Sequence, residues 1–569
     1  MQRVQEQFLA VEKSAGRERR FALAIGFIAL ALAAFPYVYG YQMTPKGMRF
    51  IGQIFAVDDY FVYLSWARQA ADGHFYIRNL FTTDPQGALQ FNVFFLLTGY
   101  LARLTGEPPD IVLQALRLLC ALGALKACYE ICRLCVPLDR KVRLTAFAFM
   151  AVGSGIGWVH QFKDRDLTKI YPSADSNQPE ALVFTSTYYA ALMGFGVMLI
   201  AASMYCLMKM AMERQTRYAL AAGVMLLVLG NVHTYDVIHV AAAWTLFLIV
   251  HALVRRRIDV ALLLRSMVAG IVALPSVVNQ YYILHHNAVF YQRALQATTL
   301  TPTIDSYIIG FGFILILALA GIRSVAIPAV KKNVDIDYGL TSLVLICWAV
   351  AGLTIVYAIP LAFQRKLIMG EQIPLSVLAA LGWGYIAQVF PTSIRRVSMG
   401  LVVLLTLPST IVFVLRDYVV LNRANTMAGS VGEPYLSKGE DAALNWISKH
   451  TKEDAAVLAA PRMSLLIPGY ADRTVWAGHW GETPKCADKE GQLSTILSAS
   501  TSDRARRAFL RKTPVTYLCY PNNPAHRSLA EMTPSGVRHR YVDLAHNTPA
   551  YLHTAYRNNE YTVFTISHP

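Results

Sequence analysis

Long apolar stretches separated by short polar loops dominate the first 416 residues of the chain. A helix needs about 20 apolar residues to cross the hydrocarbon core of a membrane. About eleven stretches have this character, and we predict a membrane-spanning helix over each of them: 21–40, 110–136, 143–160, 183–210, 216–232, 236–254, 260–282, 305–322, 339–360, 371–390 and 397–416. The pattern therefore predicts an α-helical polytopic membrane protein.

The apolar run 90–105 is shorter, and the turn-forming residues Gly106-Glu107-Pro108-Pro109 follow it at once. We interpret it as a re-entrant or interfacial helix; the alternative is a twelfth crossing. Loop charge decides between the two, because basic loops concentrate on the cytoplasmic side. If 90–105 does not cross, the basic segments all lie on one side: Arg17 to Arg20, Arg140 to Arg143, Arg214 to Arg217, Arg255 to Arg257, Lys331-Lys332 and Arg395-Arg396.

This arrangement predicts a cytoplasmic N-terminal segment, 1–20, in the inner (cytoplasmic) membrane. The loops 41–109, 161–182, 232–235, 283–304 and 361–370, and the chain after 417, are then exocytoplasmic. These loops hold most of the acidic, histidine and aromatic clusters. A single external site built from several loops is therefore the expectation.

Composition agrees with a membrane protein, since 55% of the residues are hydrophobic and only 15% are charged. The formal net charge of +16 could suggest a nucleic-acid partner. The basic residues are instead scattered through short loops between helices, as the positive-inside rule requires. We therefore expect the lipid bilayer as a partner and no nucleic acid.

Beyond about residue 420 the apolar runs stop, and helical and strand-like periods alternate. A helix at 440–447 and strands at 455–461, 473–477, 514–520 and 561–566 predict a small α/β domain. The predicted organisation is thus an N-terminal segment (1–20), a transmembrane domain (21–416) and an exocytoplasmic domain (417–569).

The C-terminal segment 474–483 carries Trp476, His479, Trp480 and Glu482. These side chains could bind a sugar or take part in catalysis, but a packing role is favoured. Cys486 and Cys519 also lie in this region. In an oxidising compartment two such cysteines are often paired, and the sequence leaves a disulfide open.

Two adjacent carboxylates, Asp58 and Asp59, follow the first apolar stretch. Ionisable groups this close to hydrocarbon are costly and by default functional. They could simply stabilise a helix start, but a carboxylate can also take the proton of an attacking hydroxyl. A polar stripe at helical spacing (Asp58, Ser65, Gln69, Asp72) and the apolar residues Phe61, Leu64 and Trp66 on other faces predict a helix at the membrane interface.

Three further external segments carry candidate residues. Pro179-Glu180-Ala181 leads into the span at 183–210, so Glu180 is expected at a helix start, whereas Asp175 is expected in a solvated loop. Between two apolar runs, Gly230 to Asp236 includes His233, Tyr235 and Asp236, and polar groups at such a break line a cavity or are buried in protein.

The third segment, 360–375, places Arg365 and Lys366 on the external side, against the positive-inside pattern. A lipid phosphate would account for them, bound by Arg as a fork and by Lys as a point charge. Snorkelling towards anionic lipids is the alternative. Arg293 is a weaker candidate of the same kind.

The acidic pair in the first external loop of a many-spanning, N-in protein resembles the signature of the GT-C glycosyltransferases. This superfamily includes protein O-mannosyltransferases, aminoarabinose transferases and oligosaccharyltransferases. Gly230 to Asp236 resembles a His-Pro-Tyr element of bacterial relatives, with Thr234 in place of the proline. The segment 360–375 resembles their Gln-Arg-Arg/Lys and Pro-Leu pattern, and the likeness in layout covers most of 20–416.

The resemblance implies an inverting hexosyl- or pentosyltransferase that moves a sugar from a polyprenyl-phosphate donor to a glycan, lipid or protein acceptor. It implies Asp58 or Asp59 as the base, and Arg365, Lys366 and Arg293 as phosphate ligands. Glu180, His233, Tyr235 and Asp236 would then bind the acceptor or the sugar.

No cofactor is required by this chemistry, because a polyprenyl phosphate is a good leaving group; a divalent metal is left open. The rival interpretations are a lipid or saccharide transporter (flippase) and a non-catalytic envelope polysaccharide assembly protein. A transporter predicts internal repeats, and we detect none.

Overall fold

The structure is a computed structural model of the chain and describes residues 2–330, 336–423, 433–526, 529 and 540–567. The chain divides into two compact units. The first unit comprises Met1–Pro36, Ala115–Gln280 and Thr299–Asp417, and the second comprises Tyr37–Gln114, Tyr281–Thr298 and Tyr418–Pro569. The loop that carries the acidic pair thus belongs to the same unit as the C-terminal segment.

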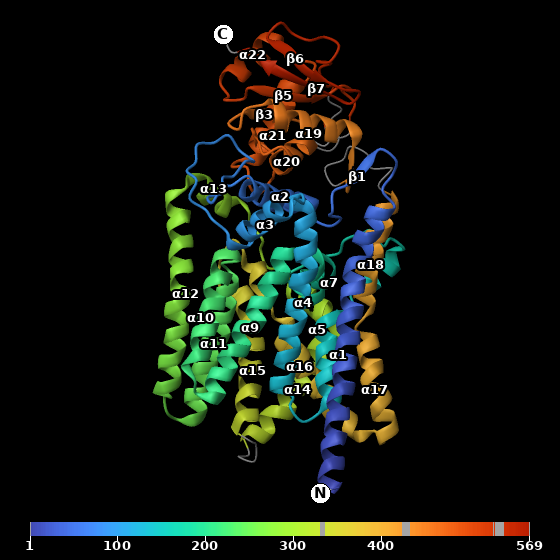
Figure 1. The fold of residues 1–569 in the computed structure, drawn as a ribbon, viewed down its shortest axis with the longest axis vertical. Coiled ribbons are helices and arrows are strands. Elements are labelled where there is room, and N and C mark those ends of the chain that lie inside the picture. Colours follow the sequence, from blue (N-terminus) through green and yellow to red (C-terminus); the bar gives the residue numbers. More distant parts are fainter. Residues whose placement is uncertain (1, 331–335, 424–432, 527–528, 530–539, 568–569) are drawn as a thin grey trace. The chain divides into compact units, whose positions relative to one another are not determined.

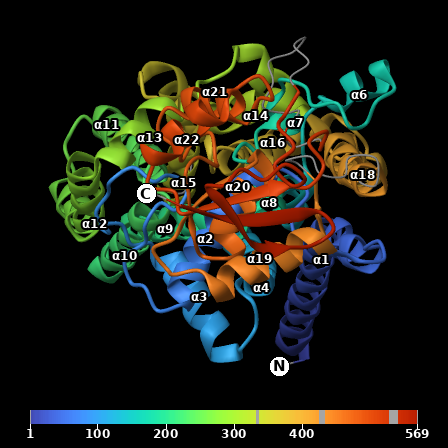
Figure 2. The same ribbon diagram turned by 90° about the horizontal axis from the view of Figure 1, so that it is seen from above.

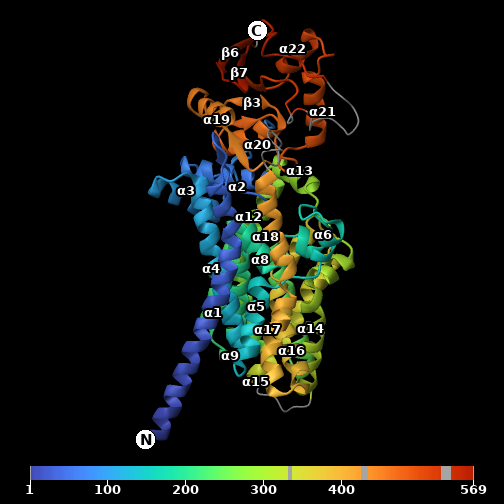
Figure 3. The ribbon, with the colours of Figure 1, turned by 90° about the vertical axis from the view of Figure 1, so that its right-hand side faces the viewer.

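The first unit is helical, and its long helices run roughly alongside one another (Figures 1 and 3). Helix α14 packs on α16, α11 on α15, and α9 on α10. The helices that lie in this unit or begin or end there are α1 (Gln2–Gln42), α4 (Pro109–Cys135), α5 (Arg140–Val152), α6 (Trp158–Asp164), α7 (Ala174–Asn177), α8 (Val183–Tyr189), α9 (Ala191–Glu213), α10 (Thr216–Val232), α11 (Asp236–Arg255), α12 (Val260–His286), α14 (Ile304–Val330), α15 (Ile336–Ala358), α16 (Gln372–Ile386), α17 (Thr392–Leu405) and α18 (Pro408–Arg423).

Nine helical stretches among the described residues are long and apolar enough to cross a membrane, against about eleven expected. The two expected spans with no counterpart among the nine are α10, an apolar helix of 17 residues, and the stretch 143–160. The expected spans 183–210 and 397–416 are each divided into two helices, α8 with α9 and α17 with α18. The predicted span over 143–160 is not one helix, because α5 ends at Val152 and α6 begins at Trp158. The chain between them runs tightly against other backbone: a Cβ on Gly155 would lie 2.0 Å from the carbonyl oxygen of Ile309.

The run predicted not to cross, 90–105, is helix α3 (Val93–Thr105). Its 13 residues fall short of a span, as expected. The side of the membrane on which each loop lies stays a prediction. The basic pair Lys331-Lys332, which contributed to that prediction, lies outside the described residues.

The second unit contains the α/β structure predicted near the C-terminus. Its five-stranded sheet has the order β4-β3-β5-β7-β6, with β3 parallel to β4 and β5, and β7 antiparallel to β5 and β6. The strands β1 and β2 form a separate antiparallel pair. The elements are β1 (Met48–Phe50), α2 (Val57–Ala71), α3, α13 (Ala288–Gln296), β2 (Tyr435–Ser437), α19 (Lys438–His450), β3 (Ala456–Ala459), α20 (Pro461–Tyr470), β4 (Thr474–Val475), α21 (Cys486–Leu497), α22 (Asp503–Arg511), β5 (Tyr517–Pro521), β6 (Leu552–Arg557) and β7 (Tyr561–Ile566).

Side chains alternate between the two faces of a sheet along each strand, and the central strands β3 and β5 are buried on both faces, whereas the edge strand β6 is largely exposed. On one face, Leu458 and Leu518 pack with apolar residues of α21 and α22. The alternate residues Val457 and Cys519 are also fully buried, and α19 and α20 contact strands of the sheet (Figure 2). The sheet is therefore a core layer that fixes the segment after β4.

Helix α2 is held inside the second unit, where it packs on α3 and α20. Phe61 is only 1% exposed and lies edge-on to Tyr470, while Trp66 lies edge-on to Phe95. The prediction that Phe61 and Trp66 face a membrane interface is therefore wrong, because neighbouring helices cover both side chains. The burial fixes α2, and with it the acidic pair at its start.

Cys486 and Cys519 are both free and buried, so the disulfide that the sequence left open is not formed. Burial raises the pKa of each thiol to about 12, which leaves little reactive thiolate at neutral pH. We expect a membrane-impermeant maleimide to label neither residue in the folded protein, with or without reductant, and both after unfolding. An Ala505→Cys variant, on the exposed side of α22, controls for access of the reagent. Labelling of Cys486 and Cys519 that appears only after reduction would contradict the free-thiol state.

Candidate active site

Asp58 and Asp59 lie in the first turn of α2, where the positive end of the helix dipole favours negative charge. The N-cap is Ala56, held at φ 46° in the left-handed region, and its side chain caps nothing. The two carboxylates are therefore not the N-cap of their helix. Their side chains are 34% and 43% exposed, so both are open to a ligand.

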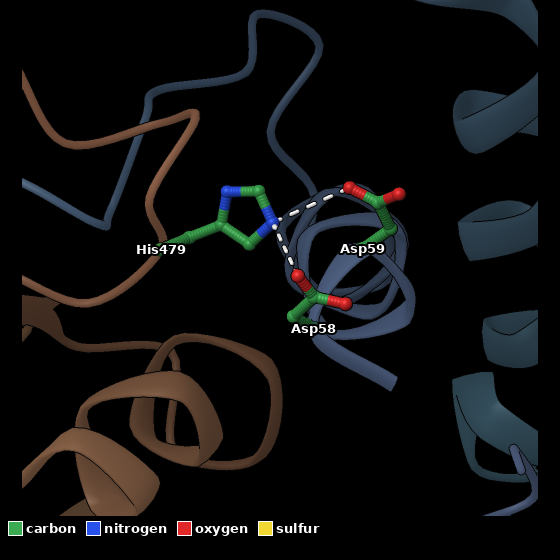
Figure 4. Close-up of side chains that lie close together, drawn as sticks. All are labelled: Asp58, Asp59 and His479. Atoms are coloured by element: carbon green, nitrogen blue, oxygen red, sulfur yellow. Dashed lines mark ion pairs between the residues drawn. The ribbon is translucent and has the colours of Figure 1, made fainter. Parts of the chain in front are cut away.

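His479, from the segment after β4, points its ring at this pair (Figure 4). Its Nε2 atom lies 3.3 Å from Oδ1 of Asp59 and 3.7 Å from Oδ2 of Asp58. The side chain of His479 is only 3% exposed. A buried imidazole and two half-exposed carboxylates thus share one small space.

Two neighbours of His479 complete the arrangement. The indole Nε1 of Trp480, a residue that is 49% exposed, donates a 3.0 Å hydrogen bond to Oδ2 of Asp58. The backbone N–H of Gly481 donates to Nδ1 of His479 at 3.0 Å. One short segment therefore supplies a hydrogen-bond donor to Asp58 and another to the ring of His479.

The protonation of His479 depends on opposing influences. Burial lowers the pKa of His479, whereas the hydrogen bond and charge of Asp59 and the charges of Glu482 and Asp58 raise it. The net pKa of His479 lies above its ordinary value. The carboxylates are the cause, so the histidine and the acidic pair act as one electrostatic group.

Arg293 on α13 has a partner within the second unit. Its Nε lies 2.7 Å from Oε1 of Glu482, and its guanidinium carbon lies 5.5 Å from the ring centres of Trp66 and Phe290. Asn79 donates to the backbone carbonyl of Glu482 at 2.7 Å. A donor phosphate would therefore have to compete with Glu482 for Arg293.

In the first unit, the structure joins Glu180 to Arg365. Nε of Arg365 lies 3.2 Å from Oε1 of Glu180, whose side chain is 2% exposed. The other oxygen of Glu180, Oε2, is buried and accepts no hydrogen bond from any described residue. The expected helix start at Glu180 is wrong, because α8 begins at Val183, and Glu180 lies in the turn before it.

The break between α10 and α11 holds a hydrogen-bonded chain of three side chains. Nδ1 of His233 lies 2.6 Å from Oδ2 of Asp236, and the hydroxyl of Tyr235 lies 2.7 Å from Nε2 of His233. The ammonium of Lys366 lies 5.3 Å from the centre of the Tyr235 ring. Oδ1 of Asp236 is buried and, within the described part of the chain, has no hydrogen-bond partner.

Asp175 is not in a solvated loop, contrary to expectation. It is buried and accepts a 2.9 Å hydrogen bond from the backbone N–H of Gly157. Gly157 follows the end of α5, so Asp175 fixes the break in the stretch that was expected to span the membrane. Asp175 therefore has a structural role.

Comparison with solved structures shows which fold this is. The oligosaccharyltransferase AglB from Archaeoglobus fulgidus, in complex with an inhibitory peptide and a dolichol-phosphate, is similar to the chain with a TM-score of 0.54 and 12% identity, over 94% of this chain and 75% of that one. The arabinofuranosyltransferase AftD from Mycobacteria is similar with a TM-score of 0.56 and 12% identity. Both are GT-C membrane glycosyltransferases. The chain has the GT-C fold.

The likeness in GT-C fold covers 96% of this chain but 40% of AftD. A second AglB structure, tethered to an acceptor peptide with the NVT sequon, is similar with a TM-score of 0.54 and 12% identity, over 93% of this chain and 74% of that one. No protein-family model and no curated protein sequence matches the chain. The apolar helices and the GT-C fold together make this a multi-pass membrane protein.

On this GT-C fold, the predicted site residues gather into two groups, one in each unit. Glu180 is paired with Arg365, while His233, Tyr235, Asp236 and Lys366 gather at the break between α10 and α11. Asp58 and Asp59 gather with His479, which sequence reasoning placed only among residues of the C-terminal domain favoured for packing. For Trp476 the packing role is correct, since it is part of the core of the sheet.

Asp58, Asp59 and His479 each offer an oxygen or nitrogen atom within 4.8 Å of the others, which is the spacing of a cation site. Carboxylate oxygens and imidazole nitrogens suit divalent metals such as Zn²⁺ and Mn²⁺. The imidazole does not fit this use, however. Its Nδ1 accepts the N–H of Gly481, so in the neutral ring Nε2 carries the proton and offers no lone pair to a metal.

Proposed function

We propose that the protein is a GT-C glycosyltransferase that transfers one sugar from a polyprenyl-phosphate donor to a hydroxyl or amide acceptor at the outer face of the cytoplasmic membrane. The acceptor attacks the anomeric carbon as the bond from that carbon to the phosphate oxygen breaks, which inverts the configuration. The proton of the acceptor goes to a carboxylate of the protein. The polyprenyl phosphate leaves with the electron pair of the broken bond.

The observation that carries this proposal is the acidic pair at the start of α2. Asp58 and Asp59 are half-exposed and lie on a helix fixed by burial, beside His479 and Trp480, whose indole donates to Asp58. A general base needs a fixed position beside the acceptor and access to it. A chain with the GT-C fold and an acidic pair of this geometry meets both needs.

Arg365 and Lys366, with Arg293 in a secondary role, are the groups we assign to the donor phosphate. Each arginine forms an ion pair with a carboxylate: Arg365 with Glu180, and Arg293 with Glu482. A guanidinium has five N–H donors, and one carboxylate contact through Nε leaves others for phosphate oxygens. The AglB complex with dolichol-phosphate supports a lipid-linked phosphate as the donor class.

Glu180, His233, Tyr235 and Asp236 are the groups we assign to the acceptor or the sugar. Oε2 of Glu180 and Oδ1 of Asp236 are buried acceptors with no donor among the described residues. Leaving such atoms unpaired is costly, and sugar hydroxyls are donors of the kind that would satisfy them. These two oxygens favour a hydroxyl-rich ligand over a purely apolar one.

The test is release of polyprenyl phosphate. The purified protein in lipid vesicles is incubated with radiolabelled undecaprenyl-phosphate sugars and candidate acceptors, and both products are followed. A glycosyltransferase releases the lipid phosphate and labels the acceptor together. Movement of intact donor across the bilayer, without release, would instead identify the transporter, and binding of polysaccharide without either would identify the assembly protein.

A further inference from the structure

We infer that a basic pocket on the second unit binds an acidic saccharide. The pocket lies between α22 and the segment that leads into β6, and its volume is about 430 Å³. Three arginines of α22 and three residues before β6 line it: Arg504, Arg507, Arg511, Pro549, Ala550 and Tyr551. The geometry of the pocket supports binding by itself, whereas the identification of the saccharide as part of the acceptor rests on the proposed function.

The three arginines form a stripe along one side of α22. Arg504, Arg507 and Arg511 follow one another at spacings of three and four residues, which places them on the same side of a helix. All three are exposed, and none of them forms a hydrogen bond or an ion pair with a described residue. Like charges at these spacings repel each other. The stripe therefore weakens its own helix unless an anion neutralises it.

A fourth arginine of the same helix shows the contrast. Arg506 is only 2% exposed and donates to the backbone carbonyls of Ile496, Ser498 and Thr501. It also forms an ion pair with Asp503. These contacts attach α22 to the end of α21, on which it packs (Figure 3). One arginine of α22 thus has a structural role, and the three that line the pocket have none.

The pocket is formed before any ligand arrives. The carbonyl of Tyr551 accepts a 3.0 Å hydrogen bond from the N–H of Ser567, and the carbonyl of Pro549 accepts one of 2.9 Å from the N–H of Leu552. Tyr551 and Leu510 of α22 belong to the same apolar core beneath the sheet. Both walls are therefore held by one core, so that binding costs little ordering of the protein.

The arginines indicate the charge and the length of the ligand. A guanidinium binds a carboxylate or a phosphate group as a fork. At about 1.5 Å per residue, Arg504 and Arg511 are about 10 Å apart along the helix axis. One carboxylate or phosphate group is too small to contact the whole stripe. The ligand therefore carries at least two such groups along its length.

The rest of the lining favours a saccharide over a membrane or a nucleic acid. Asp503 also lines the pocket, and its oxygens can accept from hydroxyl groups, which a saccharide has and a polyphosphate lacks. Binding to a membrane surface uses large apolar side chains beside the basic ones, and single-stranded nucleic acid stacks on exposed aromatic rings. The exposed apolar residues of the lining are Ala508 and Ala550, whereas Tyr551 is only 7% exposed.

The test of the pocket is a binding measurement. The full chain in phosphatidylcholine nanodiscs is titrated by calorimetry with tetragalacturonate, which carries four carboxylates, and with the neutral cellotetraose. We expect tetragalacturonate alone to bind, and Arg504→Gln combined with Arg507→Gln to weaken its binding about 10- to 100-fold. The matched control is Lys449→Gln combined with Lys452→Gln. It removes two exposed charges at the end of α19, on the other face of the sheet, and should leave binding unchanged.

A lysine variant separates a built pocket from attraction by charge alone. Arg504→Lys combined with Arg507→Lys keeps both charges but loses the forks, so binding of tetragalacturonate should weaken, though less than in the glutamine variant. Wild-type affinity in the lysine variant would overturn the inference, as would equal binding of cellotetraose. Tighter binding of an oligothymidylate, or of phosphatidylglycerol vesicles, through the same arginines would also overturn it and assign the stripe to nucleic acid or to lipid.

Thermal unfolding shows whether a variant is folded. Because the arginines of the stripe are exposed and unpaired among the described residues, we expect the glutamine variant to unfold at the wild-type temperature or above it. If the double variant unfolds at a lower temperature, the single variant Arg507→Gln takes its place in the titration. Loss of binding in a variant of wild-type stability then belongs to the pocket.

Sugar transfer tests the link to the acceptor. With tetragalacturonate as the acceptor, KM should rise about 10-fold or more in the glutamine variant while kcat stays close to wild type, because the acidic pair is unchanged. An unchanged KM in that variant would remove the pocket from acceptor binding. If the wild-type protein releases no polyprenyl phosphate with any acceptor, the proposed function fails, and the calorimetry still decides whether the pocket binds an acidic saccharide.

Discussion

Sugar transfer should fall about 10²- to 10⁴-fold when the catalytic member of the pair is changed, by Asp58→Asn or Asp59→Asn. The amide keeps the shape of the carboxylate but cannot take the proton of the acceptor. Binding of the lipid-linked donor should stay close to wild type, because neither substitution changes Arg365 or Lys366, the residues that we assign to the donor phosphate. The measurement is release of polyprenyl phosphate in single-turnover conditions, alongside donor binding.

A matched control for this pair is Asp72→Asn, since Asp72 follows the last turn of the same helix and forms an ion pair with Arg68 at the surface. It removes one carboxylate at the other end of α2 and should leave transfer unchanged. Transfer at the wild-type rate in both Asp58→Asn and Asp59→Asn would remove the general base from the mechanism. A large loss in one alone identifies which aspartate acts.

Donor binding should weaken about 10- to 100-fold in Arg365→Ala, the loss expected for charge-assisted hydrogen bonds to a phosphate. The same variant leaves the buried carboxylate of Glu180 without its partner, which should destabilise the fold by about 1–3 kcal/mol. Glu180→Gln combined with Arg365→Ala removes both charges. We expect the double variant to recover stability but not donor binding.

The double variant separates the effect on donor binding from the effect on stability. Donor binding is measured by calorimetry, and stability by thermal unfolding. Lys163→Ala, which removes an exposed charge of the first unit, controls for a general loss of positive charge. Donor affinity that returns to the wild-type value in the double variant would mean that Arg365 serves Glu180 and not a phosphate. Snorkelling to lipid would then be the better account of Lys366.

Much of the fold follows from local sequence, because apolar runs of about 20 residues have few other uses. The helix of 13 residues at Val93–Thr105 and most of the C-terminal strands lie where their periods predict. The break at 153–157 was missed, since its cause is not local: Gly155 packs against Ile309, and Asp175 holds Gly157. Strand β6 was also missed, and its exposed residues alternate poorly with buried ones.

The candidate site was predictable in part for a similar reason. Asp58, Asp59, Glu180 and Arg365 are noticeable because charges are rare beside apolar runs. His479 gave a weaker signal, the crowding of polar and aromatic residues in 474–483, and no spacing rule links it to a helix that starts at Val57. Only the sheet and α20, which fix the segment after β4, bring it to the acidic pair.

Helix α2 and helix α20 pack on each other, but the ribosome synthesises α2 long before α20. At about 5–20 residues per second, roughly 20–80 s separate the synthesis of Phe61 from that of its partner Tyr470. Throughout that interval the apolar side of α2, with Phe61 and Leu64, is without its final cover. A chain that stops before α20 keeps this surface open for good, so truncated products should be bound by chaperones or degraded well before their missing chemistry matters.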